Sequence, residues 1–152
     1  MSKPATPDHA WIADHIPHQG TMCLLDTVSQ WSEQEISCVA HSHRDADNPL
    51  RAHGRLGIAC GIEYAAQAMA VHGALLAPAD ISTPKVGYLV SVRGVNMIAN
   101  RLDDIPGALE VEASCLMASE SNMLYEFSLK SAGQLLLEGR ATVVLNAESL
   151  AI

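Results

Sequence analysis

The chain has 152 residues, of which 49% are hydrophobic and 17% are charged, and its formal net charge is −8. This length suggests one domain with a substantial core, and the composition excludes a disordered chain. The negative charge argues against nucleic acid as the main partner, and no uninterrupted apolar run is long enough to span a membrane.

Residues 1–10 lack the apolar stretch of a secretory signal, which predicts a cytoplasmic protein. We expect these residues to form a flexible lead and residues 11–152 to form a single domain. The cysteines lie in apolar surroundings and have no spacing typical of a redox or metal motif. We therefore expect reduced, buried thiols at Cys23, Cys38, Cys60 and Cys115.

The first part of the chain predicts one short helix and two strands. Residues 11–16 favour a short helix or turn, because a proline follows them. Residues 22–28 form an apolar, strand-like run, and residues 36–40 predict a second strand after a polar turn. Residues 45–55 contain an Asn-Pro pair and indicate a loop.

The second part predicts one long helix and four strands. An Ala-rich run indicates a helix over residues 57–77. Alternating apolar and polar side chains favour strands over residues 85–92, 109–117, 124–130 and 135–145. Because the helix is apolar nearly all round, it needs cover on most sides. We therefore predict an α+β fold in which a curved antiparallel sheet wraps around the helix.

Glu63 is the only charged residue of the Ala-rich helix, and Gln67 lies one turn later on the same side. A carboxylate in a buried helix is unfavourable unless it is paired, hydrogen-bonded or protonated. Burial would raise the pKa of Glu63, and a carboxyl group that keeps its proton near neutral pH can act as a general acid.

His18 is the second candidate for a chemical role. It follows Pro17, whose ring fixes the backbone, so the loop before the apolar run can aim the His18 side chain. Histidine has an ordinary pKa near neutrality and can therefore serve as a base at cellular pH.

Three motifs occur in order along residues 11–146: Pro17-His18 with Leu24-Leu25-Asp26, Glu63 with Gln67, and Gly87-Tyr88-Leu89 with Pro106-Gly107. Together they resemble the hot-dog-fold 3-hydroxyacyl-acyl-carrier-protein dehydratases. The resemblance is strongest to the branch found with aryl-polyene and other type II polyketide-like pathways, and it implies the hot-dog fold.

The resemblance also implies roles for the residues. His18 would remove the C2 proton of a 3-hydroxyacyl thioester and Glu63 would protonate the departing hydroxyl, the two residues coming from opposite subunits of a dimer. The backbone amides of Gly57 and Ile58 would face the thioester carbonyl, and Gln67 would orient Glu63 at the substrate site. The expected assembly is a homodimer or higher homo-oligomer, or a heterodimer with a homologue, and no metal or cofactor is expected.

A basic zone predicts where an acyl carrier protein docks. Residues 51–101 contain five basic side chains and only two acidic ones, although the whole chain is acidic. Such a zone suggests docking of a compact anionic partner, and the resemblance implies that this partner is the carrier protein with its phosphopantetheine-linked acyl chain. The candidate docking residues are Arg51, Arg55 and Arg93.

Two other functions remain open. A hot-dog acyl thioesterase shares the fold, the helix carboxylate and a thioester substrate, but its chemistry does not need His18. A non-catalytic hot-dog subunit would instead pair with an active homologue.

Several histidines raise the question of a metal site. His41 and His43 would share one face of a strand, with Asp45 and His53 nearby, but their spacing matches no zinc motif. We interpret them as surface histidines, and His72 on the apolar helix as a core or interface residue.

Overall fold

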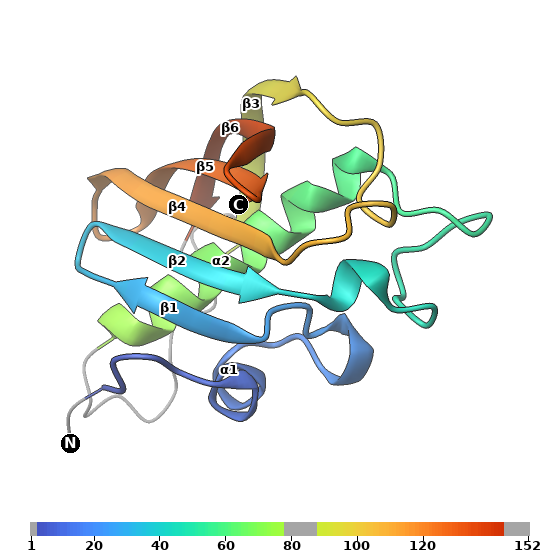
Figure 1. Ribbon diagram of the computed structural model, residues 1–152. Coiled ribbons are helices and arrows are strands. Elements are labelled where there is room, and N and C mark those ends of the chain that lie inside the picture. Colours follow the sequence, from blue (N-terminus) through green and yellow to red (C-terminus); the bar gives the residue numbers. More distant parts are fainter. Residues whose placement is uncertain (1–2, 78–87, 145–152) are drawn as a thin grey trace, which may run out of the picture.

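The computed structural model describes residues 3–77 and 88–144. The described residues form a six-stranded antiparallel sheet in the order β1-β2-β4-β5-β6-β3, curved over the helix α2 (Gly61–Leu76), with a shorter helix α1 (His9–His15) beside β1 (Figure 1). The strands are β1 (Thr27–Trp31), β2 (Glu35–Ala40), β3 (Tyr88–Met97), β4 (Leu109–Ala118), β5 (Asn122–Ser131) and β6 (Gln134–Val144). The predicted α+β arrangement, a curved sheet around one long helix, is confirmed.

Helix α2 forms the centre of the core. Ten of its 16 residues are buried, as expected for a helix with cover on most sides, and it packs against β2, β4 and β5. Its first residue, Gly61, lies so close to the sheet that an added Cβ would be 2.7 Å from Leu137 Cδ2. The small residue therefore lets the start of the helix approach the sheet closely.

Helix α1 confirms the predicted short helix. The Asp8 side chain caps it by accepting a hydrogen bond from the Trp11 amide at 2.9 Å. The segment expected as a flexible lead includes the first two residues of this helix, and its residues 3–8 precede the helix and contact β1. The Pro4 carbonyl accepts a bond from Trp31 Nε1, and the Pro7 carbonyl accepts one from the Val28 amide, both at 2.9 Å.

The predicted first strand, residues 22–28, is wrong over most of its length, because β1 begins only at Thr27. A 3-10 turn covers Gly20–Met22, and the Met22 carbonyl and both backbone polar groups of Leu24 are bonded to side chains rather than to a neighbouring strand. Gln67 binds the Met22 carbonyl and the Leu24 amide, and Ser42 binds the Leu24 carbonyl. These side-chain bonds replace the strand ladder.

The other strands are confirmed with shifted ends. Strand β3 continues to Met97, beyond the predicted end at residue 92, because a bulge at Gly94 with a positive φ of 59° interrupts the pattern without ending the strand. The predicted residues 85–87 and 145 lie outside the described residues. Ala132 and Gly133 both have positive φ and form a tight turn between β5 and β6.

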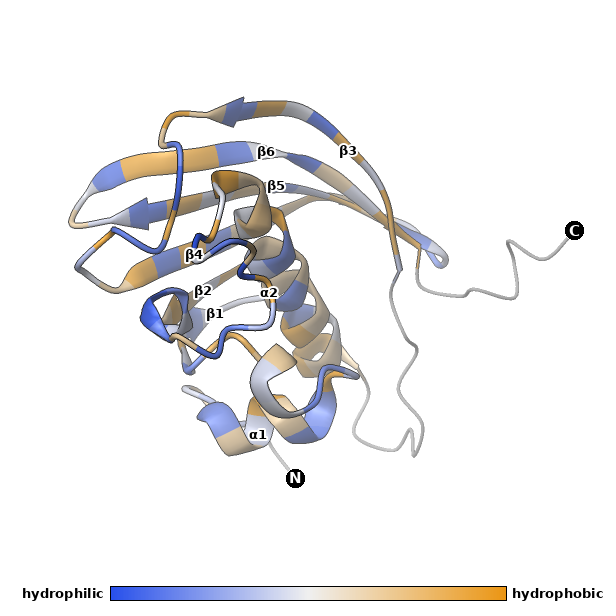
Figure 2. Ribbon diagram, turned by 90° about the vertical axis from the view of Figure 1, so that its right-hand side faces the viewer, coloured by the Kyte–Doolittle hydropathy of each residue, from blue (hydrophilic) through white to orange (hydrophobic). Residues whose placement is uncertain are grey.

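Strand β3 forms one edge of the sheet, on the side opposite to α1 (Figure 2). None of its ten residues is buried. Large apolar side chains between 39% and 52% exposed lie along this edge and just beyond it: Tyr88, Leu89, Val90, Met97 and Ile98. None of the described helices is long and apolar enough to cross a membrane.

Candidate active site

His18 and Glu63, the two residues that the sequence singled out, are in direct contact. His18 Nε2 lies 3.0 Å from Glu63 Oε1, and the two side chains are 24% and 33% exposed. His18 lies on the loop after α1, and Glu63 lies in the first turn of α2. The pair is therefore partly shielded from water and still open at the surface.

Both members of the pair belong to one chain, so the expectation that they come from opposite subunits is wrong for this structure. The reason is the loop after His18, which bonds directly to α2 of its own chain. Gln67 holds this loop: its Oε1 accepts from the Leu24 amide at 2.9 Å, and its Nε2 donates to the Met22 carbonyl at 2.7 Å.

Gln67 also reaches Glu63, as predicted. Its Nε2 lies 3.4 Å from Glu63 Oε1, one helical turn away. The Gln67 side chain is fully buried and its amide is occupied by these protein contacts. It therefore joins the loop that carries His18 to the helix residue Glu63.

The electrostatics of Glu63 differ from the sequence-based expectation. The hydrogen bond from His18 is the largest influence and lowers the pKa of Glu63, and the bond from Gln67 acts in the same direction. Burial raises it, as the sequence suggested, but this effect is the smaller one. The resting carboxyl group is therefore ionised, and a proton must reach it before it can act as an acid.

The second ring nitrogen of His18 has no partner. Because Nε2–H donates to the carboxylate, the neutral ring carries its lone pair on Nδ1. That atom is buried and forms no hydrogen bond with the described residues. The ring is therefore oriented by Glu63 and keeps an unused basic site.

Of the two backbone amides predicted at the start of the helix, one is occupied and one has no acceptor among the described residues. The Ile58 amide donates to the Asn100 carbonyl at 3.1 Å, so the prediction that it faces a thioester carbonyl is wrong. Gly57 forms only an isolated bridge with this segment, and its amide and that of Ala59 have no acceptor among the described residues. Ala59 lies one turn before Glu63 and was missed, because the sequence does not reveal the 3-10 turn over Ile58–Cys60.

Of the predicted docking residues, Arg51 and Arg55 lie together on the loop before the helix. The Arg51 guanidinium donates to three backbone carbonyls of that loop, those of Arg44, Asp45 and Gly54. These three bonds stabilise a tight turn in which His53 and Gly54 have positive φ. Arg55 is exposed and lies three residues before the 3-10 turn that leads into α2.

Arg93 does not join this loop, because it lies within β3 opposite Arg140 of β6. Two other arginines do lie at the loop and were missed. Arg44 donates to the Asp103 carbonyl at 2.9 Å, and Arg101 forms an ion pair with the buried Asp103 carboxylate. The partner of Arg44 is 59 residues away in the chain, so no local pattern indicates its place, and Arg101 is brought here by its bridge with Gly57.

The histidines do not form a metal site. The described residues contain no group of three potential metal ligands. His41 is exposed and paired with Asp26, but His43 is fully buried and its Nε2 lies 3.0 Å from the Ile105 and Gly107 carbonyls, which corrects its interpretation as a surface histidine. The two do not share a strand face, because β2 ends before them.

His72 is a core residue, as predicted, with bonds to the Tyr125 hydroxyl at 2.6 Å and the Ser32 carbonyl at 2.8 Å. The four cysteines are free, as expected. Cys23 and Cys38 are buried, whereas Cys60 and Cys115 are only partly buried.

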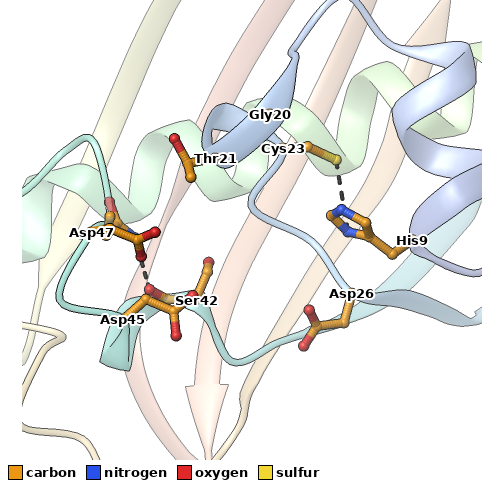
Figure 3. Close-up of a pocket in the computed structure, with 9 residues that line it drawn as sticks. His9, Gly20, Thr21, Cys23, Asp26, Ser42, Asp45 and Asp47 are labelled. Atoms are coloured by element: carbon orange, nitrogen blue, oxygen red, sulfur yellow. Dashed lines mark hydrogen bonds between the residues drawn. The ribbon is translucent and has the colours of Figure 1, made fainter.

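A pocket of about 230 Å³ lies beside the His18 loop but includes neither His18 nor Glu63. Gly20 and Thr21 of that loop form part of its wall (Figure 3). The wall also carries three carboxylates, those of Asp26, Asp45 and Asp47. An acidic wall repels anionic ligands, so we do not assign the chemistry to this pocket.

A family model described as ApeP-like, ApeP dehydratase, matches residues 10–151. The chain belongs to the ApeP-like dehydratase family. The resemblance to hot-dog dehydratases of the aryl-polyene branch is thereby confirmed. No curated protein sequence matches this ApeP-like chain.

Solved structures support the hot-dog fold of the ApeP-like chain. The dehydratase heterocomplex ApeI:P from Xenorhabdus doucetiae is similar with a TM-score of 0.80 at 22% identity, covering 92% of this chain and 94% of that one. A mutant of the thioesterase PA1618 from Pseudomonas aeruginosa gives a TM-score of 0.64 at 12% identity, with coverages of 91% and 93%. Thioesterase HI1161 from Haemophilus influenzae gives 0.58 at 13% identity, with coverages of 87% and 80%.

Proposed function

We propose that this ApeP-like dehydratase converts 3-hydroxyacyl thioesters, carried on an acyl carrier protein, into trans-2-enoyl thioesters for an aryl-polyene or similar pathway. The observation that carries the proposal is the contact between His18 Nε2 and Glu63 Oε1 at 3.0 Å. A chain of a dehydratase family that holds a base and a carboxyl group in contact has the two groups that elimination of water requires.

The reaction removes a proton from C2 and adds one to the hydroxyl that leaves C3. We assign the first step to His18 and the second to Glu63. The resting pair, a neutral imidazole and a carboxylate, first takes up one proton from water to give the reactive pair, a neutral imidazole and a carboxylic acid. After one turnover the pair is an imidazolium and a carboxylate, and moving one proton from His18 to Glu63 restores the reactive arrangement.

Substrate binding provides a reason for this proton to move. The bond from His18 is the main influence that lowers the pKa of Glu63, and burial opposes it. An acyl chain that separates the two groups removes the bond and excludes water, so burial then dominates and raises the pKa of Glu63. Glu63 becomes an acid at the moment when His18 is released to act as a base.

The thioester oxygen needs stabilisation as C2 loses its proton. We propose the amides of Gly57 and Ala59 as donors, since neither has an acceptor among the described residues. They precede the 16-residue helix α2, whose N-terminal dipole favours negative charge at this position.

The test is dehydration by the purified protein, followed by the absorbance of the enoyl product. We expect His18→Ala and Glu63→Gln each to lower kcat by about 10²–10⁴-fold. His41→Ala is the matched control, because His41 forms a histidine–carboxylate pair with Asp26 away from the site. Unchanged turnover in both active-site variants would contradict the proposal.

A thioesterase is the second candidate, because several structural neighbours are thioesterases. The same reaction mixtures distinguish the two functions. Release of free thiol without enoyl product, and with His18→Ala unaffected, would favour the thioesterase.

We propose that strand β3 pairs with a second hot-dog subunit, either another copy or a homologue. The support is its unburied backbone edge with apolar side chains, together with the heterocomplex among the structural neighbours. The acyl carrier protein would dock near the helix start, at the loop that carries Arg51 and Arg55, and Arg93 would contribute from the paired edge.

Docking can be tested with two substrates. We expect Arg55→Glu to weaken turnover of carrier-bound substrate and to spare a short pantetheine thioester, because the latter needs no protein docking. Lys130→Glu is the control, because Lys130 is a 39% exposed basic residue of β5, which is two strands from β3. Equal losses on both substrates would contradict a docking role.

A further inference from the structure

Ser42 and Tyr64 form a polar contact beside the His18–Glu63 pair that the proposed chemistry does not use. We propose that they are positioning residues: they fix Leu24 and thereby hold the His18 loop against Glu63. This inference rests on the proposed function, because it concerns the same pair of groups.

Tyr64 follows Glu63 directly in α2 and is fully buried. Its hydroxyl lies 2.8 Å from Ser42 Oγ and accepts a hydrogen bond from Asn48 Nδ2 at 3.1 Å. Ser42 Oγ in turn donates to the Leu24 carbonyl at 2.8 Å.

The hydrogen bonds among these residues have one consistent direction of donation. Ser42 has a single hydroxyl proton, which it gives to Leu24, so Tyr64 must donate its own proton to Ser42. The Tyr64 oxygen remains free to accept from Asn48. Each donor therefore has one acceptor, and a chain of bonds in one direction is mutually strengthening.

Leu24 is held at both of its backbone polar groups by side chains. Gln67 of α2 accepts from its amide, and Ser42, itself held by Tyr64 of α2, donates to its carbonyl. Leu24 is fully buried, so water does not replace either bond when it is lost. The His18 loop is therefore attached to the catalytic helix at two independent points.

This attachment affects the chemistry because the same helix, α2, carries Glu63 and the two residues that hold the loop. Glu63, Tyr64 and Gln67 lie within little more than one turn of that helix. Any slip of the loop along α2 changes the separation of His18 Nε2 and Glu63 Oε1, and a misplacement of about 1 Å can lower a rate by about 100-fold.

The test compares two buried tyrosines. Tyr64→Phe and Ser42→Ala each remove one bond of the relay, and Ser42→Thr restores the hydroxyl. Tyr125→Phe is the matched control, because Tyr125 is equally buried and its hydroxyl bonds His72, away from the site.

The first readout is the titration of the Glu63 carboxyl by carbon NMR, which needs no turnover. We expect its pKa to rise toward the ordinary value in Tyr64→Phe and Ser42→Ala, because the bond from His18 weakens, and to stay unchanged in Ser42→Thr and Tyr125→Phe. The second readout is dehydration, for which we expect kcat to fall roughly 10- to 100-fold with little change in KM.

A Glu63 titration that is the same in all variants, or that shifts equally in Tyr125→Phe, would overturn the inference. The proposed function fails separately. If Glu63 responds but the native chain forms no enoyl product, the positioning role stands and the dehydration proposal is wrong. If the native chain dehydrates but Glu63 does not respond, the positioning role is wrong.

Discussion

The sheet has a covered side, formed by strands β2, β4 and β5, and an open side, formed by the edge strand β3. Strands β2, β4 and β5 pack on α2, and β5 alternates strictly between buried and more exposed residues. Strand β3, at the other side, has no buried residue. The His18–Glu63 pair belongs to the covered side, together with the bonds that hold it. The chain therefore brings His18 and Glu63 together by itself, and the edge at β3 lies elsewhere in the sheet.

The largest effect is expected on the covered side, at Gln67. Gln67→Leu leaves the Met22 carbonyl and the Leu24 amide without partners in a buried position. Two such losses lower the free energy of unfolding by about 2–6 kcal/mol, and kcat falls as well because the His18 loop is released. Urea unfolding and the enoyl assay measure the two effects.

Gln30→Leu on β1 is the control, because Gln30 is exposed. Equal stability and activity in Gln67→Leu and Gln30→Leu would contradict the view that the covered side depends on this amide.

An intermediate effect is expected on the open side, at Val90, which is 48% exposed. A lysine in an edge strand opposes pairing, so Val90→Lys should weaken subunit association by at least about tenfold, or about 1.4 kcal/mol. Sedimentation over a range of concentrations measures this change. We expect each dissociated chain to keep its His18–Glu63 contact.

Met117→Lys is the control for assembly, because Met117 is 69% exposed on β4, away from the β3 edge. If Met117→Lys dissociates the subunits as strongly as Val90→Lys, the assembly edge is not β3.

A smaller effect should appear with pH, since His43 and His72 are buried and burial lowers the pKa of both. Below about pH 6.5 the unfolded chain binds protons that the folded chain excludes. The free energy of unfolding should therefore fall as the pH drops below this value. The decrease is at most about 1.4 kcal/mol per pH unit for each histidine.

His72→Gln should reduce this dependence, because it removes one of the two buried histidines. Unfolding curves between pH 7 and pH 5 test the difference. The same slope in native protein and in His72→Gln would contradict the assignment of His72 as a buried neutral group.

The sequence predicted the parts of the site that depend on local context. Glu63 is conspicuous because its helix is otherwise apolar, and His18 because a proline precedes it. The strand over residues 22–28 was predicted wrongly because its hydrogen bonds go to Gln67 and Ser42, which are distant in the chain.

The same limit explains the errors in chemistry. The direction of the pKa shift of Glu63 depends on a 3.0 Å contact with His18, 45 residues earlier, and outweighs the burial that the sequence indicates. The Ile58 amide is occupied because the Asn100 carbonyl lies beside it. Long-range contacts of this kind leave no periodic signal in the sequence.

The central claim is that one chain supplies both His18 and Glu63, and mixing two inactive variants tests it most directly. His18→Ala and Glu63→Gln chains are co-expressed with different tags, the mixed assemblies are isolated, and dehydration is measured. If each chain completes its own pair, the mixed assemblies stay as inactive as either variant. Recovery of about half of native activity in the isolated mixed dimers, as expected for one intact shared site out of two, would contradict the account.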